Sequence, residues 1–268
     1  MKKKKRNIFL TIIQIVLVGV MLYSGYNIFT YYYENWKNTQ LINESKSSVA
    51  QIEKEYASNG DIKALGKLDK DEAAKKIIKE LQKKNKDVVA FVRLQEAEIY
   101  YPVVYVKNDN SYYLWKNLDK EFSRPGTIFL NGFNKSNFTD MNSTLFGHHL
   151  QTKNAHLLAP MFKYLLRFSE SDFVDPNKEY KIELFTEEGY KEYKVFSGYT
   201  TSEEDNYISP NYKKSEWVKF LEKRRKMSDI KMKFNHEFSE NDKILTLSTC
   251  GEDVTAPIRY VIHGILVE

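Results

Sequence analysis

The chain contains one cysteine, few residues that interrupt regular structure, and no surplus of charge beyond its first residues. Its 268 residues include a single Cys, Cys250, together with 6 prolines and 11 glycines. A lone thiol cannot form an internal disulfide. So few prolines and glycines mark no linker between domains and no internal repeat. The part that follows the first helix, about 230 residues, is long enough for one domain with a sizeable core.

The charge balance excludes a class of partner. The chain has 41 basic and 36 acidic residues, and five of the basic residues lie within positions 2–6, which leaves 36 of each sign in the remainder. Binding to nucleic acid would need a clustered basic excess, so we expect no nucleic-acid partner. The basic run 223–226 is more typical of the solvent-exposed face of a helix.

One long hydrophobic run is present, at residues 8–29, and it contains no charged side chain. At about 1.5 Å per residue, such a helix spans a hydrocarbon core of roughly 30 Å. We expect an uncleaved membrane anchor with the basic residues on the cytoplasmic side and the rest of the chain outside the cell. The alternative is a cleaved signal peptide, which usually has a shorter apolar region. Aromatic residues then lie at the outer interface: Tyr23, Tyr26, Tyr31, Tyr32, Tyr33 and Trp36.

The predicted organisation is a cytoplasmic tail at 1–6, a transmembrane anchor at 7–30, an extracytoplasmic helical stalk at 31–64 and one folded domain at 65–268. A second helix follows the stalk, with Asp69 as its expected cap. Its apolar residues share one stripe: Ala74, Ile77, Ile78 and Leu81.

After Lys86 the pattern changes to short β-branched and aromatic runs that are separated by polar turns. Eight strands are predicted: 88–94, 99–106, 127–131, 143–148, 179–185, 191–200, 243–250 and 258–267. Two helices interrupt them, one at 159–168 and one at 215–227 that Ser215 is expected to cap. Many short strands with few helices favour a mostly β, closed or nearly closed barrel.

The position of Cys250 gives it a potential chemical role. Because strand side chains alternate, Thr246, Ser248 and Cys250 share one face of the penultimate strand. On the last strand, Arg259 and His263 share a face, so neighbouring strands would bring Cys250 and Arg259 to the same rim. A nearby guanidinium favours the nucleophilic thiolate and offers donors to a developing oxyanion. The alternative is a buried cysteine that acts only as a small apolar side chain.

A proton donor is also needed, and we choose His148 among the five histidines because it follows Gly147 at a predicted strand end. His263 has a second interpretation, as a core histidine whose hydrogen bonds are satisfied. Glu203, Glu204 and Asp205 cluster in the sequence, and a solvated turn is a simpler interpretation than a calcium site.

Taken together, these segments resemble the sortases, membrane-anchored cysteine transpeptidases of Gram-positive bacteria, and class B in particular. The matching segments are YPVVYVKNDNSYYL at 101–114, PGTIFL at 125–130, NSTLFGHHL at 142–150, TLSTC at 246–250 and IRYVIHGILV at 258–267. The resemblance runs in the same order from about residue 65 to the C-terminus. One departure is His149, since class B members often have asparagine after the catalytic histidine.

The resemblance implies a closed eight-stranded sortase-type β-barrel with N-terminal helices and an additional helix before the cysteine strand. It carries over His148, Cys250 and Arg259 as catalytic residues. The implied enzyme cleaves a C-terminal sorting motif of secreted surface proteins after threonine, through a thioacyl intermediate. The acceptor would be an amine of a peptidoglycan cross-bridge or of a pilin lysine, and no cofactor or metal is needed.

Five residues are expected to contact the bound peptide. They lie close in sequence to the thiol or shortly before the helix at 215–227: Ser248, Thr249, Glu252, Tyr207 and Ile208. Two other functions remain possible at this point. One is a hydrolytic cysteine peptidase acting on the cell wall, and the other is a non-catalytic, membrane-tethered barrel that binds a surface partner.

Overall fold

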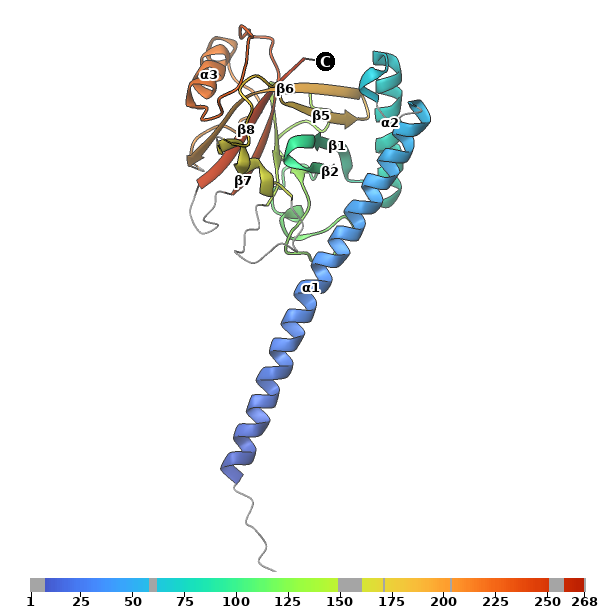
Figure 1. Cartoon of the computed structure of the whole chain (residues 1–268), viewed down its shortest axis with the longest axis vertical. Helices are drawn as coiled ribbons and strands as arrows, with labels where there is room; N and C mark the ends of the chain where they lie inside the picture. The colour runs from blue at the N-terminus through green and yellow to red at the C-terminus, as the bar shows by residue number, and fades with distance from the viewer. Residues whose placement is uncertain are drawn as a thin grey trace, which may run out of the picture.

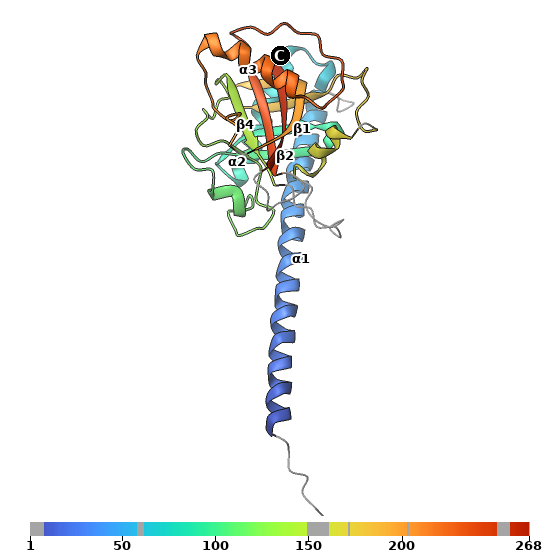
Figure 2. The same cartoon turned by 90° about the vertical axis from the view of Figure 1, so that its left-hand side faces the viewer.

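The computed structural model describes residues 8–57, 62–148, 161–170, 172–202, 204–250 and 258–267. For Cys250 it describes the backbone. A single long helix extends from a β-barrel domain that carries shorter helices on its outside (Figures 1 and 2). The prediction of a mostly β domain with N-terminal helices is confirmed.

Eight strands form the barrel in the described part of the chain. They pair in the order β1-β2-β3-β4-β7-β8-β6-β5, and β5 pairs with β1 to close it. Their bounds are β1 Val88–Leu94, β2 Ile99–Val104, β3 Phe129–Leu130, β4 Asn142–Phe146, β5 Lys181–Thr186, β6 Gly189–Ser202, β7 Ile244–Cys250 and β8 Ile258–Leu266. Most pairs are antiparallel, whereas β2 with β3 and β4 with β7 are parallel. The closed eight-stranded barrel is therefore confirmed.

Alternation along β7 and β8 sorts side chains between the inside and the outside of the barrel. Leu245, Leu247 and Ile262 belong to the main apolar core. Ile244 and Ile265 instead pack outside the barrel against aromatic side chains that include Trp217 of the helix α3, Lys214–Met227. Val261, nearer the other end of this face, packs against Tyr199 and Tyr207, so protein covers the outer face of these strands as well.

The long helix α1, Ile8–Tyr56, contains both the predicted anchor and the predicted stalk in one uninterrupted element of 49 residues. Its apolar first part is long enough to cross a membrane, and its side chains are exposed. Its second part is not a detached stalk, because it packs on β2 and on the helix α2, Lys67–Lys84. One side of this part is buried at helical spacing: Asn35, Asn38, Leu41, Ile42, Ser45, Val49, Ile52 and Glu53.

The expected caps of two helices are wrong. Helix α2 begins at Lys67 with Gly66 at its N-cap, so Asp69 lies within the first turn. Helix α3 begins at Lys214 with Lys213 at its N-cap, and Ser215 is already helical. In both cases the helix extends further toward the N-terminus than the capping residue predicts, by residues that are exposed.

Short 3-10 helices join the strands. They are η1 Ile62–Ala64, η2 Gln95–Ala97, η3 Tyr112–Trp115 and η4 Lys163–Ser169. The helix predicted at 159–168 corresponds to η4, with its first two residues outside the described part of the chain.

The basic run at 223–226 is not wholly exposed, since Arg224 is only 2% exposed.

Candidate active site

The ends of three strands meet at one rim of the barrel. β7 and β8 are antiparallel, and their register places the Cα of Cys250 opposite that of Arg259. β4 runs parallel to β7, with Phe146 opposite Ser248. His148 follows two residues after β4, not inside a strand as predicted. The chain therefore brings His148, Cys250 and Arg259 to the same end of the sheet.

A surface pocket lies at this rim. It is lined by residues from five segments: Asn110, Leu114, Phe129, Phe146, Gly147, His148, Ser248, Thr249 and Arg259. Four residues that the sequence predicted for the site are among them, and the backbone of Cys250 directly follows Thr249. The hydroxyl oxygen of Thr249 is buried and has no hydrogen-bond partner among the described residues. The pocket thus combines an imidazole, a guanidinium and an apolar wall.

Two residues of η3, Leu114 and Trp115, contact the imidazole of His148. Its Nε2 lies 2.9 Å from the carbonyl oxygen of Leu114, and its ring centre lies 5.1 Å from that of Trp115. Because a carbonyl only accepts, Nε2 carries the proton and Nδ1 is the nitrogen that can take up another. Burial lowers the pKa of His148 below its usual value, against the opposing effect of the bond to Leu114. At neutral pH the imidazole is therefore uncharged and able to act as a base.

Gly147 has a steric reason to precede His148. A Cβ atom at this position would lie 2.8 Å from the ring of Phe162, closer than side chains pack. The absence of a side chain therefore lets the chain pass Phe162 and turn into the pocket. The glycine of the Gly-His pair therefore gives the backbone the path that places His148 in the pocket.

Arg259 is the second residue of β8 and is partly buried. Its Nη1 donates a hydrogen bond of 2.8 Å to the carbonyl oxygen of Ile258. That bond holds the guanidinium close to its own strand, beside the end of β7. A planar guanidinium has five N–H donors, so it can hold this bond and still donate to an oxygen in the pocket.

The predicted peptide contacts divide into those that line the pocket and those that support it. Ser248 and Thr249 line it. Tyr207 is 3% exposed and lies behind the pocket, with its hydroxyl 2.9 Å from that of Ser248. The carbonyl oxygen of Ile208 accepts a hydrogen bond of 3.2 Å from Asn131. Among the described residues, neither Tyr207 nor Ile208 lines the pocket, and Glu252 lies outside the described part of the chain.

Behind β7 and β8, His263 is part of a buried chain of hydrogen bonds. Thr246 donates to Asn142 at 2.6 Å, so it accepts the hydrogen bond of 2.8 Å from Nδ1 of His263. Nε2 of His263 then accepts from the hydroxyl of Tyr199 at 2.9 Å. The side-chain amide of Asn142 donates to the carbonyl oxygen of Tyr207 at 2.8 Å. His263 is thus a core histidine with satisfied nitrogens, and Asn142 links this chain of hydrogen bonds to the segment around Tyr207.

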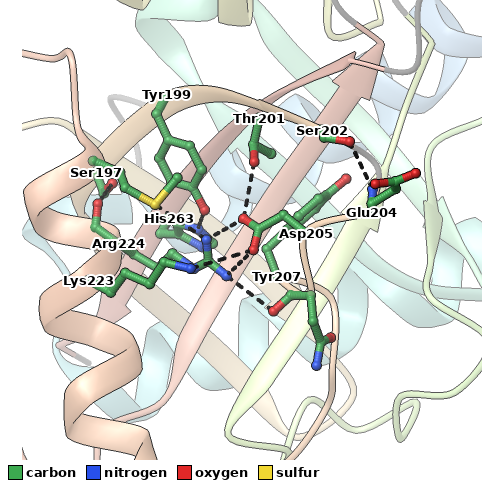
Figure 3. Close-up of polar contacts among 12 residues, drawn as sticks. Ser197, Tyr199, Thr201, Ser202, Glu204, Asp205, Tyr207, Lys223, Arg224 and His263 are labelled. Atoms are coloured by element: carbon green, nitrogen blue, oxygen red, sulfur yellow. Dashed lines mark hydrogen bonds and ion pairs between the residues drawn. The ribbon is translucent and has the colours of Figure 1, made fainter.

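A buried ion pair completes this layer (Figure 3). Both terminal nitrogens of Arg224 contact the carboxylate of Asp205, and Nη2 does so at 3.0 Å. Thr201 donates to the same carboxylate at 3.1 Å. Glu204 is exposed and Asp205 lies in a turn, as predicted, with its N–H donating to the carbonyl oxygen of Ser202 at 3.1 Å. The Asp205 carboxylate has a further role, because it neutralises a buried guanidinium. Glu203 lies outside the described residues, within which no cluster of potential metal ligands occurs.

The buried His263 predicts an acid-sensitive fold. Burial lowers the pKa of His263 to about 3, whereas an unfolded histidine titrates near 6.5. The associated stability is present above pH 6.5 and is lost as the pH falls toward 3, by about 1.4 kcal/mol per pH unit. We expect H263Q to lose less stability than the wild type between pH 7.5 and 4, with a difference on the order of 3 kcal/mol. Denaturant unfolding of the full-length protein in detergent measures it, and parallel losses in both proteins would contradict the assignment.

Three features of the site could not be found from the sequence. The carbonyl of Leu114 that holds His148 belongs to the backbone, and no residue pattern indicates which carbonyl a distant side chain will meet. Trp115 lies directly after the segment 101–114, and its contact with His148 depends on the way η3 folds over the rim. Asn110 belongs to the matching segment 101–114, but nothing in that segment shows that it lines the pocket and bonds to Asn131 at 3.1 Å.

Comparisons with known proteins agree on one family. The chain is 31% identical over 257 residues to sortase B of Listeria monocytogenes, covering 94% of each protein. It is 27% identical over 258 residues to sortase B of Staphylococcus aureus, covering 95% of this chain and 94% of that one. No family model matches the chain.

Solved structures give the same result for the fold. The Staphylococcus aureus sortase B–substrate complex has a TM-score of 0.62 and 28% identity, and the match covers 72% of this chain and 86% of that one. A sortase B complexed with triglycine has a TM-score of 0.63 and 28% identity, covering 73% and 87%. Sortase B of Clostridium perfringens has a TM-score of 0.61 and 28% identity, covering 71% and 99%.

Proposed function

Because this chain belongs to the sortase B family of cysteine transpeptidases, we propose that it cleaves a short sorting motif of a secreted protein after a threonine and joins the new acyl end to an amine. The observation that carries the proposal is the pairing of Cys250 with Arg259 at the rim where His148 lines a pocket. One solved relative, the sortase B of Staphylococcus aureus, was determined in complex with its substrate, which supports a substrate-binding role for this chain.

In the first half-reaction the neutral imidazole of His148 takes the thiol proton of Cys250, and the resulting thiolate attacks the carbonyl carbon of the threonine. A carbon–sulfur bond forms and the carbonyl oxygen gains negative charge, which Arg259 is placed to stabilise. The intermediate then collapses, the carbon–nitrogen bond breaks, and the amine departs with a proton from His148. The product is a thioacyl enzyme, which conserves the reactivity of the bond.

In the second half-reaction an incoming amine replaces the one that departed. The neutral imidazole of His148 takes the proton from the attacking amine, a task that its lowered pKa favours near neutral pH. A carbon–nitrogen bond forms, the carbon–sulfur bond breaks, and the proton returns from His148 to the sulfur of Cys250. An amide is exchanged for an amide, so the reaction needs no cofactor. The acceptor is an amine of a peptidoglycan cross-bridge or of a lysine side chain. The sortase B complexed with triglycine supports a glycine-type amine as acceptor.

We also propose that α1 anchors the enzyme in the cell membrane by its first part. Residues 1–6 would then lie in the cytoplasm and the barrel outside, as the basic cluster before the apolar run indicates. The apolar side chains of this part of α1 are exposed, so no other part of the described chain covers them. A lipid bilayer would cover them.

We expect even a conservative replacement of Arg259 by lysine to lower the activity. In R259K a compact ammonium replaces the planar fork of donors, so the positive charge remains but the geometry is lost. We expect kcat to fall by about 10²- to 10³-fold, the usual effect of removing an oxyanion donor. R167K is the matched control, because Arg167 lies on the exposed side of η4 and pairs with Glu170 at 3.2 Å. Equal activities of R259K and R167K would remove Arg259 from the mechanism.

The direct test of the proposed reaction uses the full-length protein in detergent with a library of threonine-containing peptides, each with and without triglycine. We expect peptides cut after threonine and, when triglycine is present, products extended by triglycine. Products that are hydrolysed equally with and without triglycine would indicate a peptidase instead. If no peptide reacts and Cys250 is alkylated only after unfolding, the barrel is a binding protein.

A further inference from the structure

A loop of the barrel domain, residues 115–124, lies against α1 near the end of the apolar run. Arg124 connects the two: its Nη1 donates to Glu34 at 2.8 Å. Its guanidinium carbon lies 5.8 Å from the ring centre of Tyr31 and 5.9 Å from that of Phe122. The side of the barrel that holds this loop faces the protruding part of α1 (Figures 1 and 2).

A second set of contacts fixes the loop slightly farther along the helix. Lys37 of α1 contacts Glu121, and it lies 3.5 Å from Asp119. Single ion pairs at a surface contribute little stability. Here the contacts of Lys37 and Arg124 act together and hold one short loop at a defined height on α1. The position of the loop along the axis of α1 is therefore fixed by these contacts.

Large aromatic side chains around these contacts are turned outward. Phe122 is 60% exposed on the loop, and on α1 the exposed fractions are 52% for Tyr32, 49% for Tyr33 and 59% for Trp36. A hollow beside them is lined by Asn27, Ile28, Tyr31, Tyr32 and Arg124. A cluster of exposed aromatics usually marks a binding surface. Aromatic rings accompanied by arginine are typical of the boundary between lipid and water.

The spacing along α1 places this cluster at the level of the lipid headgroups. The apolar run ends at Phe29, and Tyr31 follows about 3 Å along the helix axis, with Trp36 about 10 Å away. The headgroup layer on each side of the hydrocarbon core is roughly 5–8 Å thick. Tyr32 and Tyr33 therefore lie within this layer, whereas the backbone of Trp36 lies just beyond it; side chains of a helix point back toward its N-terminus, which brings the Trp36 ring closer to the layer. Phe122 shares the level of Tyr31 through Arg124. The loop and the aromatic turn of α1 therefore reach the same layer.

We propose that Phe122, Tyr32, Tyr33 and Trp36 form a lipid-docking surface that inserts into the headgroup region of the outer leaflet. The inference rests on the proposed membrane anchor. The loop that carries Phe122 begins at Trp115, whose ring contacts His148. Docking of this surface therefore fixes the pocket at a set height and orientation above the bilayer. It makes the barrel a peripheral membrane domain, not a head that moves freely on its anchor.

Depth-dependent quenching by brominated lipids tests the proposal on the full-length protein in bilayer nanodiscs. The chain has three tryptophans, and replacing Trp36 and Trp115 by phenylalanine leaves the buried Trp217 as a constant background. In this background F122W reports on the loop. L22W reports on the apolar run, and L68W is the matched control. Leu68 is 79% exposed in the first turn of α2, beyond Glu55 and so about 40 Å from Phe29 along α1.

We expect the tryptophan emission of F122W to be blue-shifted. Its intensity should be mostly quenched in lipid that is brominated near the headgroup. L22W should respond to bromine deep in the acyl chain, and L68W to neither lipid. If L22W is quenched and F122W, like L68W, is not, the result supports the membrane anchor and contradicts the docking surface. If L22W is not quenched, the anchor fails and the docking surface fails with it. Quenching of all three reporters would indicate unspecific contact and would also overturn the proposal. Equal thermal midpoints of the three variants check the fold.

Discussion

C250A forms neither thioacyl enzyme nor product under conditions in which the wild type turns over. Cys250 is the only thiol of the chain, so no other sulfur can accept the acyl group. Loss of the nucleophile in a covalent mechanism costs on the order of 10⁴-fold or more in kcat, because the remaining groups catalyse little without it. Chromatography of the peptide products, with and without triglycine, measures the loss.

The thermal midpoint of C250A shows whether the variant is still folded. Cys250 lies at the end of β7, where the ladder with β8 reaches its last pair. We therefore expect a thermal midpoint close to that of the wild type. Substantial residual turnover by a folded C250A would show that the sulfur is not the nucleophile, and the sorting reaction would have to proceed without a covalent intermediate.

H148A is expected to lose about 10²- to 10⁴-fold in kcat, the range that removal of a general acid and base produces. Without the imidazole, neither the departing amine nor the incoming one exchanges its proton within the pocket. H236A is the matched control, because His236 pairs with Asp242 at 3.0 Å and is not part of the pocket lining. Activity assays of both variants at several pH values give the comparison.

A further readout distinguishes a catalytic loss from a structural one. Added imidazole should restore part of the activity of H148A, because a small base can enter the space that the side chain vacates. If H148A keeps its activity and H149A loses it, the acting histidine is the next residue along the chain. Rescue of neither variant, together with a lowered thermal midpoint, would assign His148 a structural role.

The sequence predicted those parts of the site that depend on local periodicity. Strand alternation placed Cys250 and Arg259 on matching faces, and the register of β7 with β8 confirms that they are opposite one another. The same alternation separated Leu245 and Leu247, which fill the barrel, from Ser248, which lines the pocket. A period of two residues is fixed by backbone geometry, so it holds whatever surrounds the strand.

Contacts between distant segments could not be predicted in the same way. Arg224 stands in a run of basic residues that is typical of an exposed helix face, yet it is buried against Asp205, 19 positions earlier in the chain. Thr246 meets Asn142 across 104 positions. Such pairs form only after the barrel has closed, and composition near either residue carries no sign of its partner. The helix starts at Lys67 and Lys214 show the same limit on a smaller scale.

The measurement that tests the central claim most directly is mass spectrometry of the full-length protein after incubation with a reactive threonine-containing peptide and no amine. We predict an added mass equal to the peptide up to and including its threonine, located on the digestion fragment that contains Cys250 and removed by hydroxylamine. Product formation without this adduct, or an adduct on any other residue, would contradict a mechanism in which Cys250, His148 and Arg259 act together at one rim of the barrel.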